Sequence, residues 1–203
     1  MTTTGTEKAK SFQDIDLDKL TVFIDKKTIK ILVNGAPLVF QTGQCTLPFP
    51  VSKYDNKYSG LDNYIVSTRA SLELEEFWNK FDEKLKELIV PFSSSEYVPV
   101  MKTHSQYPSV FKMKLPRNSH GIFTIVAFDD DTKVKIDTDN VQEIFCKGRQ
   151  FNACVTCDKI VDFKDRLTVS LTVSQIKYID APYESYEESD ETTALDLNKC
   201  MIE

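Results

Sequence analysis

The segment from Leu167 to Ile179 alternates between apolar and polar residues, and this alternation changes phase once. Its apolar residues lie first at odd and then at even positions, at Leu167, Val169, Leu171, Val173, Ile176 and Tyr178. Alternation predicts a strand with one buried face, and a phase change keeps that face buried only where an extra residue is inserted. We therefore expect a long strand with a β-bulge near Ser174 and Gln175, as in a strongly coiled barrel.

Shorter alternating or apolar runs predict the remaining strands. They lie at residues 20–40, 110–116, 121–128, 133–137 and 150–157. Within the first of these, Asn34-Gly35 predicts a tight hairpin turn, because both residues tolerate positive φ. Within 110–116, Phe111, Met113 and Leu115 are expected on one face, opposite Lys112 and Lys114. Residues Thr42 to Asn63 are predicted to form a long loop.

One amphipathic helix is predicted between Leu72 and Ile89. Its apolar residues recur at spacings of three and four, at Leu74, Phe77, Trp78, Phe81, Leu85, Leu88 and Ile89. The fold is therefore expected to be mainly β, a small closed or sandwiched antiparallel sheet with one capping helix. We divide the chain into a flexible N-terminus (residues 1–18), a single domain (19–180) and an acidic disordered tail (181–203).

The charge of the chain is unevenly distributed. The whole sequence holds 31 acids and 25 bases. Residues 181–203 contain seven of the acids and one base, which leaves 24 of each in residues 1–180. The acids nearest the domain are Glu184, Glu187, Glu188, Asp190 and Glu191.

The sequence lacks the usual motifs of catalysis, and we predict that the protein is not an enzyme and uses no cofactor or metal. Cys154 and Cys157 have C-x-x-C spacing but fall in a predicted strand, where residues three apart point to opposite faces. Asp129-Asp130-Asp131 has the chemistry to bind a divalent cation, although three acids between strands are more often a solvated turn. The first residues show no signal peptide, and no segment predicts a membrane span, so we expect a soluble intracellular protein.

Basic residues are interleaved with aromatic ones along the predicted strands. Single-stranded nucleic acid needs such a combination, because cations track the phosphates and aromatic faces stack on the bases. The candidate DNA-binding residues are Lys102, Tyr107, Lys112, Lys114, Arg117, Lys133, Lys135, Lys147, Arg149, Phe151, Lys164 and Arg166. Exposed strand faces also carry lysines for solubility alone, and Phe151 is equally well explained as a core residue.

The order of these parts resembles a known family. A strand, an inserted helix, Val110-Phe-Lys-Met-Lys-Leu115 leading into Phe123-Thr-Ile-Val-Ala-Phe128, a last strand Arg166 to Ile179 and an acidic end are similar to the OB-fold single-stranded DNA-binding proteins of tailed phages and large DNA viruses. The resemblance implies an OB-like barrel that holds single-stranded DNA on its open face, and homodimers. It further implies a tail that contacts polymerase or helicase, and action at sites of viral DNA replication in the host cytoplasm or nucleus.

Two other functions stay open at this point. One is a protein-interaction module that uses the acidic tail and the amphipathic helix. The other is a nucleic-acid-processing enzyme that uses Asp129 to Asp131. For the DNA-binding function, the tail is expected to compete with DNA for the same basic groove, because a tethered polyanion has a high effective concentration.

Overall fold

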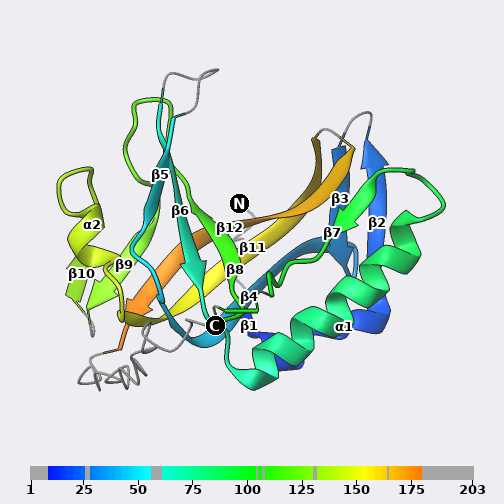
Figure 1. The fold of residues 1–203 in the computed structure, drawn as a ribbon, viewed down its shortest axis with the longest axis horizontal. Helices are drawn as coiled ribbons and strands as arrows, with labels where there is room; N and C mark the ends of the chain where they lie inside the picture. Colours follow the sequence, from blue (N-terminus) through cyan, green and yellow to red (C-terminus); the bar gives the residue numbers. More distant parts are fainter. Residues whose placement is uncertain are drawn as a thin grey trace, which may run out of the picture.

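The computed structural model describes residues 9–25, 28–55, 61–103, 105–106, 108–129, 132–163 and 165–179. Within these residues, twelve strands join in one bent sheet with a single long helix (Figure 1). The predicted mainly β class with one main helix is confirmed. In the same described residues, no helix is long and apolar enough to cross a lipid bilayer.

The elements follow one another along the chain in a β-rich order. The strands are β1 (Lys10–Ser11), β2 (Leu20–Asp25), β3 (Thr28–Val33), β4 (Ala36–Thr46), β5 (Ser52–Tyr54), β6 (Asn63–Thr68), β7 (Glu96–Val98), β8 (Phe111–Leu115), β9 (Val126–Asp129), β10 (Thr132–Val134), β11 (Gln150–Phe163) and β12 (Arg166–Tyr178). The helices are α1 (Leu72–Ile89) and α2 (Val141–Ile144), with short 3-10 helices at Phe12–Asp14 and Leu17–Lys19.

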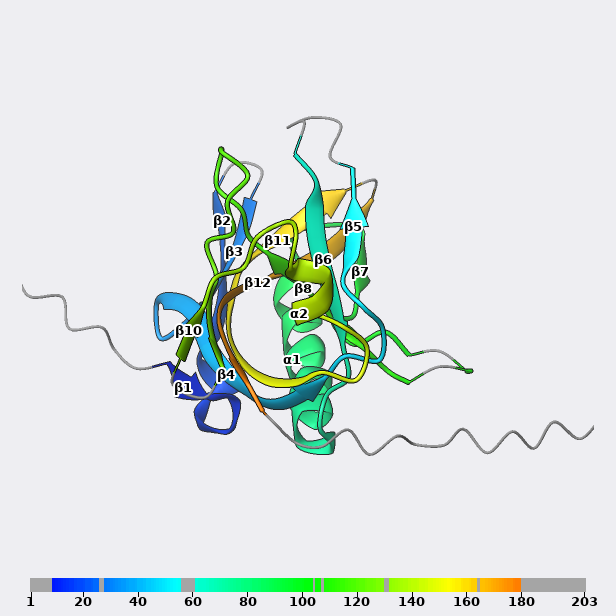
Figure 2. The ribbon, with the colours of Figure 1, turned by 90° about the vertical axis from the view of Figure 1, so that its left-hand side faces the viewer.

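Five of these strands follow one another in a ring of pairings. β4 pairs with β11, β11 with β12 and β6 with β8, all antiparallel, whereas β12 and β8 are parallel. Between β4 and β6 there is an isolated bridge, in which the backbones of Thr46 and Arg69 exchange hydrogen bonds of 2.8 and 3.4 Å. Figure 2 shows the strong bend of β4 and β11 that brings these strands round.

The predicted bulge in the last strand is confirmed. Gln175 pairs with Cys154 and Val173 pairs with Val155, so Ser174 is the inserted residue on β12. Its hydroxyl donates a hydrogen bond of 3.1 Å to the carbonyl oxygen of Cys154. The insertion keeps Val173 and Ile176 on the buried face despite the change of phase.

One edge of β12 holds three strands in succession. β11 pairs along the other edge, so β7, β8 and β9 all lie on the free one, each parallel to β12. β7 pairs near Arg166, β8 at Thr172 and β9 from Gln175 onward. β12 therefore aligns three segments that are far apart in the sequence.

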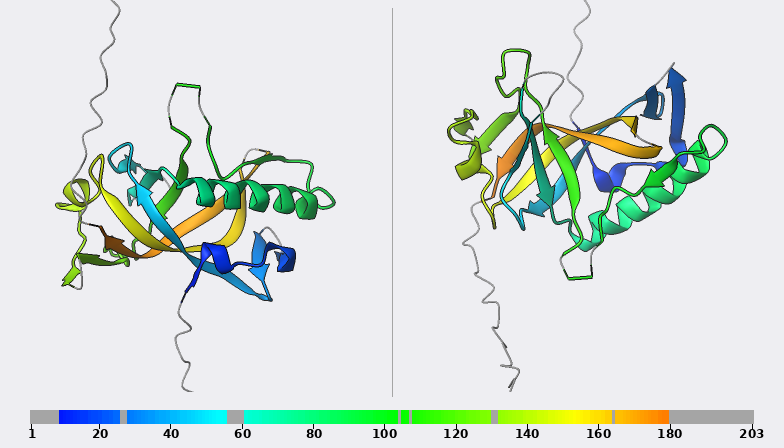
Figure 3. Two further views of the ribbon diagram at one scale, coloured as in Figure 1. Left: turned by 90° about the horizontal axis from the view of Figure 1, so that it is seen from below. Right: turned by 45° about the horizontal axis from the view of Figure 1, so that its top comes forward.

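The helix α1 has the predicted bounds and lies along the sheet (Figure 3). Its apolar residues from Leu74 to Ile89 are buried or packed against the core. Trp78 makes ring contacts with Phe40 of β4 and Phe111 of β8, at centroid distances of 5.6 and 5.8 Å. The Ser71 hydroxyl caps the helix by accepting a hydrogen bond from the Leu74 N–H. The part of the stripe from Leu74 to Ile89 is therefore covered by the sheet and is not open to a partner.

The structure corrects three predicted boundaries. Residues 9–18 are part of the body, since Phe12 is buried and its ring contacts Phe77. The predicted loop from Thr42 to Asn63 is wrong in part, because β4 runs to Thr46 and β5 lies within it. The strand predicted at residues 121–128 begins only at Val126. The hairpin turn is confirmed, with positive φ at Asn34 and at the following glycine.

Candidate nucleic-acid interface

The outer face of β6, β8 and β12 gathers the strand lysines predicted from alternation. Phe111, Met113 and Leu115 are buried, whereas Lys112 and Lys114 are exposed. Lys112 lies opposite Ser67, and Lys114 lies opposite Ile65 on one side and Thr172 on the other. Directly opposed residues share a face, so the two lysines stand on a surface of smaller side chains.

Two further cations join this face from other segments. Lys102 bridges to Val110 immediately before β8, and Arg166 opens β12. Burial lowers the pKa of Lys102, and the positive charges of Lys112 and Arg166 act in the same direction. Lys102 is therefore close enough to Lys112 and Arg166 to feel their charges, while the Asp82 carboxylate raises its pKa. Arg166 also forms an ion pair of 3.6 Å with Glu96. We call Lys102, Lys112, Lys114 and Arg166 the cation face.

A buried carboxylate positions the segment that carries Lys102. Asp82 of α1 is 4% exposed and accepts hydrogen bonds from the Tyr97 hydroxyl, at 2.5 Å, and from the Val100 N–H, at 2.9 Å. Burial raises the pKa of Asp82, and these two hydrogen bonds oppose that effect. The Lys102 ammonium in turn donates a hydrogen bond of 2.8 Å to the Pro99 carbonyl oxygen. The connection from β7 to β8 is thus fastened to the helix.

Asp82→Ala is expected to lower the free energy of unfolding by about 1–3 kcal/mol, because it leaves one buried and one partly buried donor without their acceptor. Urea denaturation measures the loss, and Glu83→Ala, at the exposed neighbouring position, is the matched control. Equal stabilities of the two variants would show that the carboxylate does not fasten this connection.

A cavity of about 320 Å³ lies at the end of β8. Its lining comes from β6, β8, β12 and the segments beside them, and includes Asp62, Asn63, Tyr64, Lys114, Arg117, Asn118 and Thr172. The Arg117 guanidinium donates hydrogen bonds to the carbonyl oxygens of Gly121 and Asp62, at 2.6 and 3.1 Å. It also lies over the rings of Tyr64 and Phe123, at 5.3 and 5.4 Å from their centroids. Arg117, which was predicted to bind DNA, thus links two segments of the cavity wall through these hydrogen bonds.

An exposed aromatic residue beside this cavity was absent from the predicted site. Tyr54 of β5 is 48% exposed and lies opposite Asn63, one of the residues that line the cavity. The preceding Lys53 forms an ion pair of 2.9 Å with Asp62, which raises the pKa of Lys53. Only a loop containing Tyr and Lys was predicted here, because a three-residue strand has too little alternation to recognise.

Two other predicted residues, Lys133 and Arg149, lie at the far end of β12 instead. Lys133 lies opposite Phe128, which pairs with Lys177, about 17 Å along the strand from Thr172. The Arg149 guanidinium lies 5.3 Å from the ring centroid of Tyr178. Lys135 and Lys147 are exposed near these two residues in the chain. This second group does not lie on the outer face of β6 and β8.

Phe151 requires a correction. Its side chain is fully buried, and it lies opposite Cys45 and Tyr178, which are also buried. Phe151 is therefore a core residue and offers no ring to a base. The remaining candidates, Tyr107, Lys164 and the acids of the tail, lie outside the described residues, as do Asp130 and Asp131.

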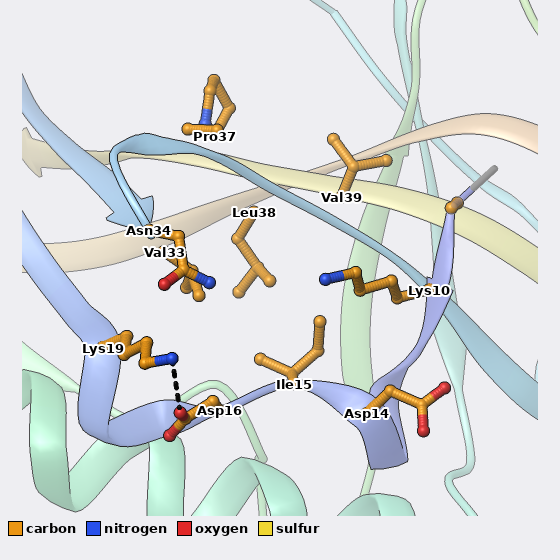
Figure 4. A pocket seen from close by; sticks show the side chains of 12 residues that line it. Lys10, Asp14, Ile15, Asp16, Lys19, Val33, Asn34, Pro37, Leu38 and Val39 are labelled. Carbon is orange, nitrogen blue, oxygen red and sulfur yellow. Dashed lines mark ion pairs between the residues drawn. The ribbon is translucent and has the colours of Figure 1, made fainter. Parts of the chain in front are cut away.

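A larger hollow, of about 630 Å³, lies between the N-terminal segment and the β3–β4 hairpin (Figure 4). Its lining is apolar at Ile15, Val33, Pro37, Leu38 and Val39, with Lys10, Asp14, Asp16 and Lys19 around them. Lys19 and Asp16 form an ion pair of 3.4 Å. Two lysines balanced by two aspartates give no excess positive charge, so this hollow does not suit a polyanion.

Comparison with known proteins gives distant similarities of fold. No model of a protein family matches the chain. No curated protein matches it either. Among solved structures, it is similar to the single-stranded DNA-binding protein from bacteriophage Enc34 in complex with ssDNA, with 11% identity, a TM-score of 0.47, and coverage of 82% of this chain and 99% of that chain.

Two further structures of the same phage protein are also similar. A C-terminal truncation has 12% identity, a TM-score of 0.46, and coverage of 81% of this chain and 98% of that chain. A third structure of the phage protein has 11% identity, a TM-score of 0.45, and coverage of 83% of this chain and 95% of that chain. At such TM-scores the likeness assigns no function to this chain.

Proposed function

We propose that this chain binds single-stranded DNA without sequence preference, across the outer face of β6, β8 and β12, without catalysing a reaction. The observation that supports this most is the cation face, because the exposed Lys112 and Lys114 of β8 share one face with Lys102 and Arg166, which come from two other segments. Closely spaced cations bind a chain of phosphates, and base stacking is tolerant of sequence. Tyr54, exposed beside the cavity, supplies an aromatic face for a base.

We further propose that the five-strand ring is an OB-type barrel. Its strands in chain order are β4, β6, β8, β11 and β12, and the ring runs β4-β6-β8-β12-β11 with one parallel pair, β8 and β12. In OB folds the face of the second and third strands binds oligonucleotides, together with the loops between strands one and two and between four and five. Here those elements are β6 and β8, the connection that holds Tyr54, and the hairpin that ends at Arg166.

Fluorescence anisotropy with a labelled oligodeoxythymidine tests the function. The logarithm of the affinity is expected to fall linearly with the logarithm of the salt concentration, with a slope of about −0.7 for each phosphate neutralised. Four bound phosphates give a slope near −3, on the order expected for the cation face. Binding that does not respond to salt, or no binding at low salt, would contradict the proposal.

The resemblance found in the sequence adds proposals about the biological role. We propose that the protein supports viral DNA replication, recombination or repair inside the host cell, as a homodimer, and that its tail contacts polymerase or helicase. The tail also serves as a competitor of DNA. Its seven acids and one base follow the end of β12 at Tyr178, and a tethered segment keeps a high effective concentration near the surface of its own domain.

Removal of residues 181–203 is therefore expected to tighten binding of single strands, and to do so more at low salt, because the competition is electrostatic and screened over about 10 Å at 0.1 M salt. Anisotropy of the full chain and of residues 1–180 at two salt concentrations measures the difference. Equal affinities at both concentrations would exclude competition by the tail.

A further inference from the structure

We propose that the path of single-stranded DNA continues from the cation face over β12 and β11 to β3 and β2, where Lys159, Lys30 and Phe23 form a second contact site. This inference rests on the proposed function. It assigns a role to an exposed surface on the far side of β12, and it predicts a longer DNA footprint than the outer face of β6 and β8 provides.

A continuous row of paired residues crosses the sheet at this place. Phe23 lies opposite Lys30, Lys30 lies opposite Lys159, and Lys159 lies opposite Ser170. Opposed residues on neighbouring strands project from the same face, so the three side chains and Ser170 share one surface.

The same row meets the cation face at β8. Thr172 of β12 pairs with Lys114 of β8. Because the two strands are parallel, the residues two positions earlier, Ser170 and Lys112, lie at the same level of the sheet. Residues two apart on a strand share a face, so Ser170 and Thr172 project to the side that carries the strand lysines. Ser170 is short and buried, and it lies between the longer side chains of Lys112 and Lys159.

The site has the composition that single strands require. Lys30 and Lys159 are both exposed, and their direct pairing concentrates two positive charges on one part of the surface. Phe23 is 55% exposed, which is unusual for a large apolar ring on a strand. Cations for phosphates beside a ring for a base repeat the combination seen at Lys114 and Tyr54.

The geometry also gives the span of the extension. From Lys112 on β8 to Phe23 on β2 the row crosses four spacings between strands, or about 19 Å at ~4.8 Å each. A short oligonucleotide bound at the cation face is not long enough to reach Phe23 as well. The second site should therefore act on long oligonucleotides alone.

A tryptophan placed at the site reports stacking directly. The chain has one native tryptophan, Trp78, which is fully buried and so gives a constant background. Phe23→Trp should show quenched emission when a long oligodeoxythymidine binds, and little change with the shortest one that binds. Leu72→Trp, at a position 79% exposed at the start of α1, is the control and should not respond.

Affinity measurements separate the ring from the charges. Phe23→Ser should weaken binding of long oligonucleotides by roughly five-fold or more, the change that corresponds to loss of one stacked base. Lys30→Gln with Lys159→Gln should reduce the salt slope for long oligonucleotides by about 1.4, that is 0.7 for each lost phosphate contact. Lys80→Gln with Lys84→Gln, on α1, is the matched control with the same change of charge.

The outcomes distinguish this inference from the function on which it rests. If the unchanged protein binds long and short oligonucleotides but the tryptophan at position 23 is not quenched, the second site is wrong and the cation face stands. If Phe23→Ser changes only the sedimentation of the protein, then β2 is a contact between copies of the chain, which also overturns the inference. If the unchanged protein does not bind DNA at all, both proposals fall.

Discussion

Replacement of Lys112 and Lys114 together by glutamate is expected to weaken binding of single-stranded DNA by a factor of a hundred or more at low salt, roughly 3 kcal/mol. The change removes two phosphate contacts and puts two negative charges at the centre of the cation face, beside Lys102 and opposite Thr172. The salt slope should become shallower by about 1.4, or by more where the new carboxylates repel the remaining phosphates. All sequences should be weakened alike, because phosphate contacts carry no sequence information.

The matched control is Lys133→Glu with Lys147→Glu, which makes the same change of charge at the far end of β12. Lys133 is placed by its pairing about 17 Å along β12 from Thr172, more than a screening length at 0.1 M salt, so the effect of the control should be small at that concentration. A larger loss from the control pair than from Lys112 and Lys114 would mean that DNA binds at the end of β12. The urea midpoint of each variant shows whether the fold is kept.

Phe151→Ala is expected to lower the free energy of unfolding by about 3–5 kcal/mol, the typical cost of removing a buried phenylalanine ring. Phe151 begins the buried face of β11 and lies between Cys45 and Tyr178, so its loss leaves a cavity between β4 and β12. Burial raises the pKa of the Cys45 thiol to about 12, which agrees with an apolar environment here. Urea denaturation measures the loss of stability.

The fraction of Phe151→Ala that remains folded should bind DNA with the normal affinity and salt slope, because the ring is not on the surface. Asn152→Ala changes the exposed neighbour on the same strand and should have little effect on stability. Weakened binding by fully folded Phe151→Ala, with the slope kept, would restore Phe151 as a stacking residue.

Features set by local pattern were predictable from the sequence. The spacing of its apolar residues predicts the helix α1, and the Asn-Gly pair predicts the turn at Asn34. The change of phase in β12 predicts the bulge at Ser174. The exposure of Lys112 beside buried Met113 follows from alternation alone. Each of these depends on residues within about two turns or one strand of one another.

The choice among the candidate cations was not predictable, because it depends on long-range pairing. Lys112 and Lys133 look alike in the sequence, and what separates them is that β8 pairs with the middle of β12 and β9 with its end. Tyr54 was missed because β5 is short, and Phe12 because a single apolar residue shows no period. The row through Lys159 and Lys30 needs the register of three strands, which no local signal records.

The position of β12 in the chain also affects when the protein becomes competent during its synthesis. β12 is the last of the described strands along the chain, and β7, β8, β9 and β11 all pair with it. The ribosome delivers β12 after all of these partners, and its pairings with β7, β8 and β9 join residues far apart in the sequence, so these contacts form slowly. A nascent chain that ends before β12 therefore holds Lys112 and Lys114 on the β6–β8 pair alone, without Arg166 and without the strand that aligns β7 and β9 beside them.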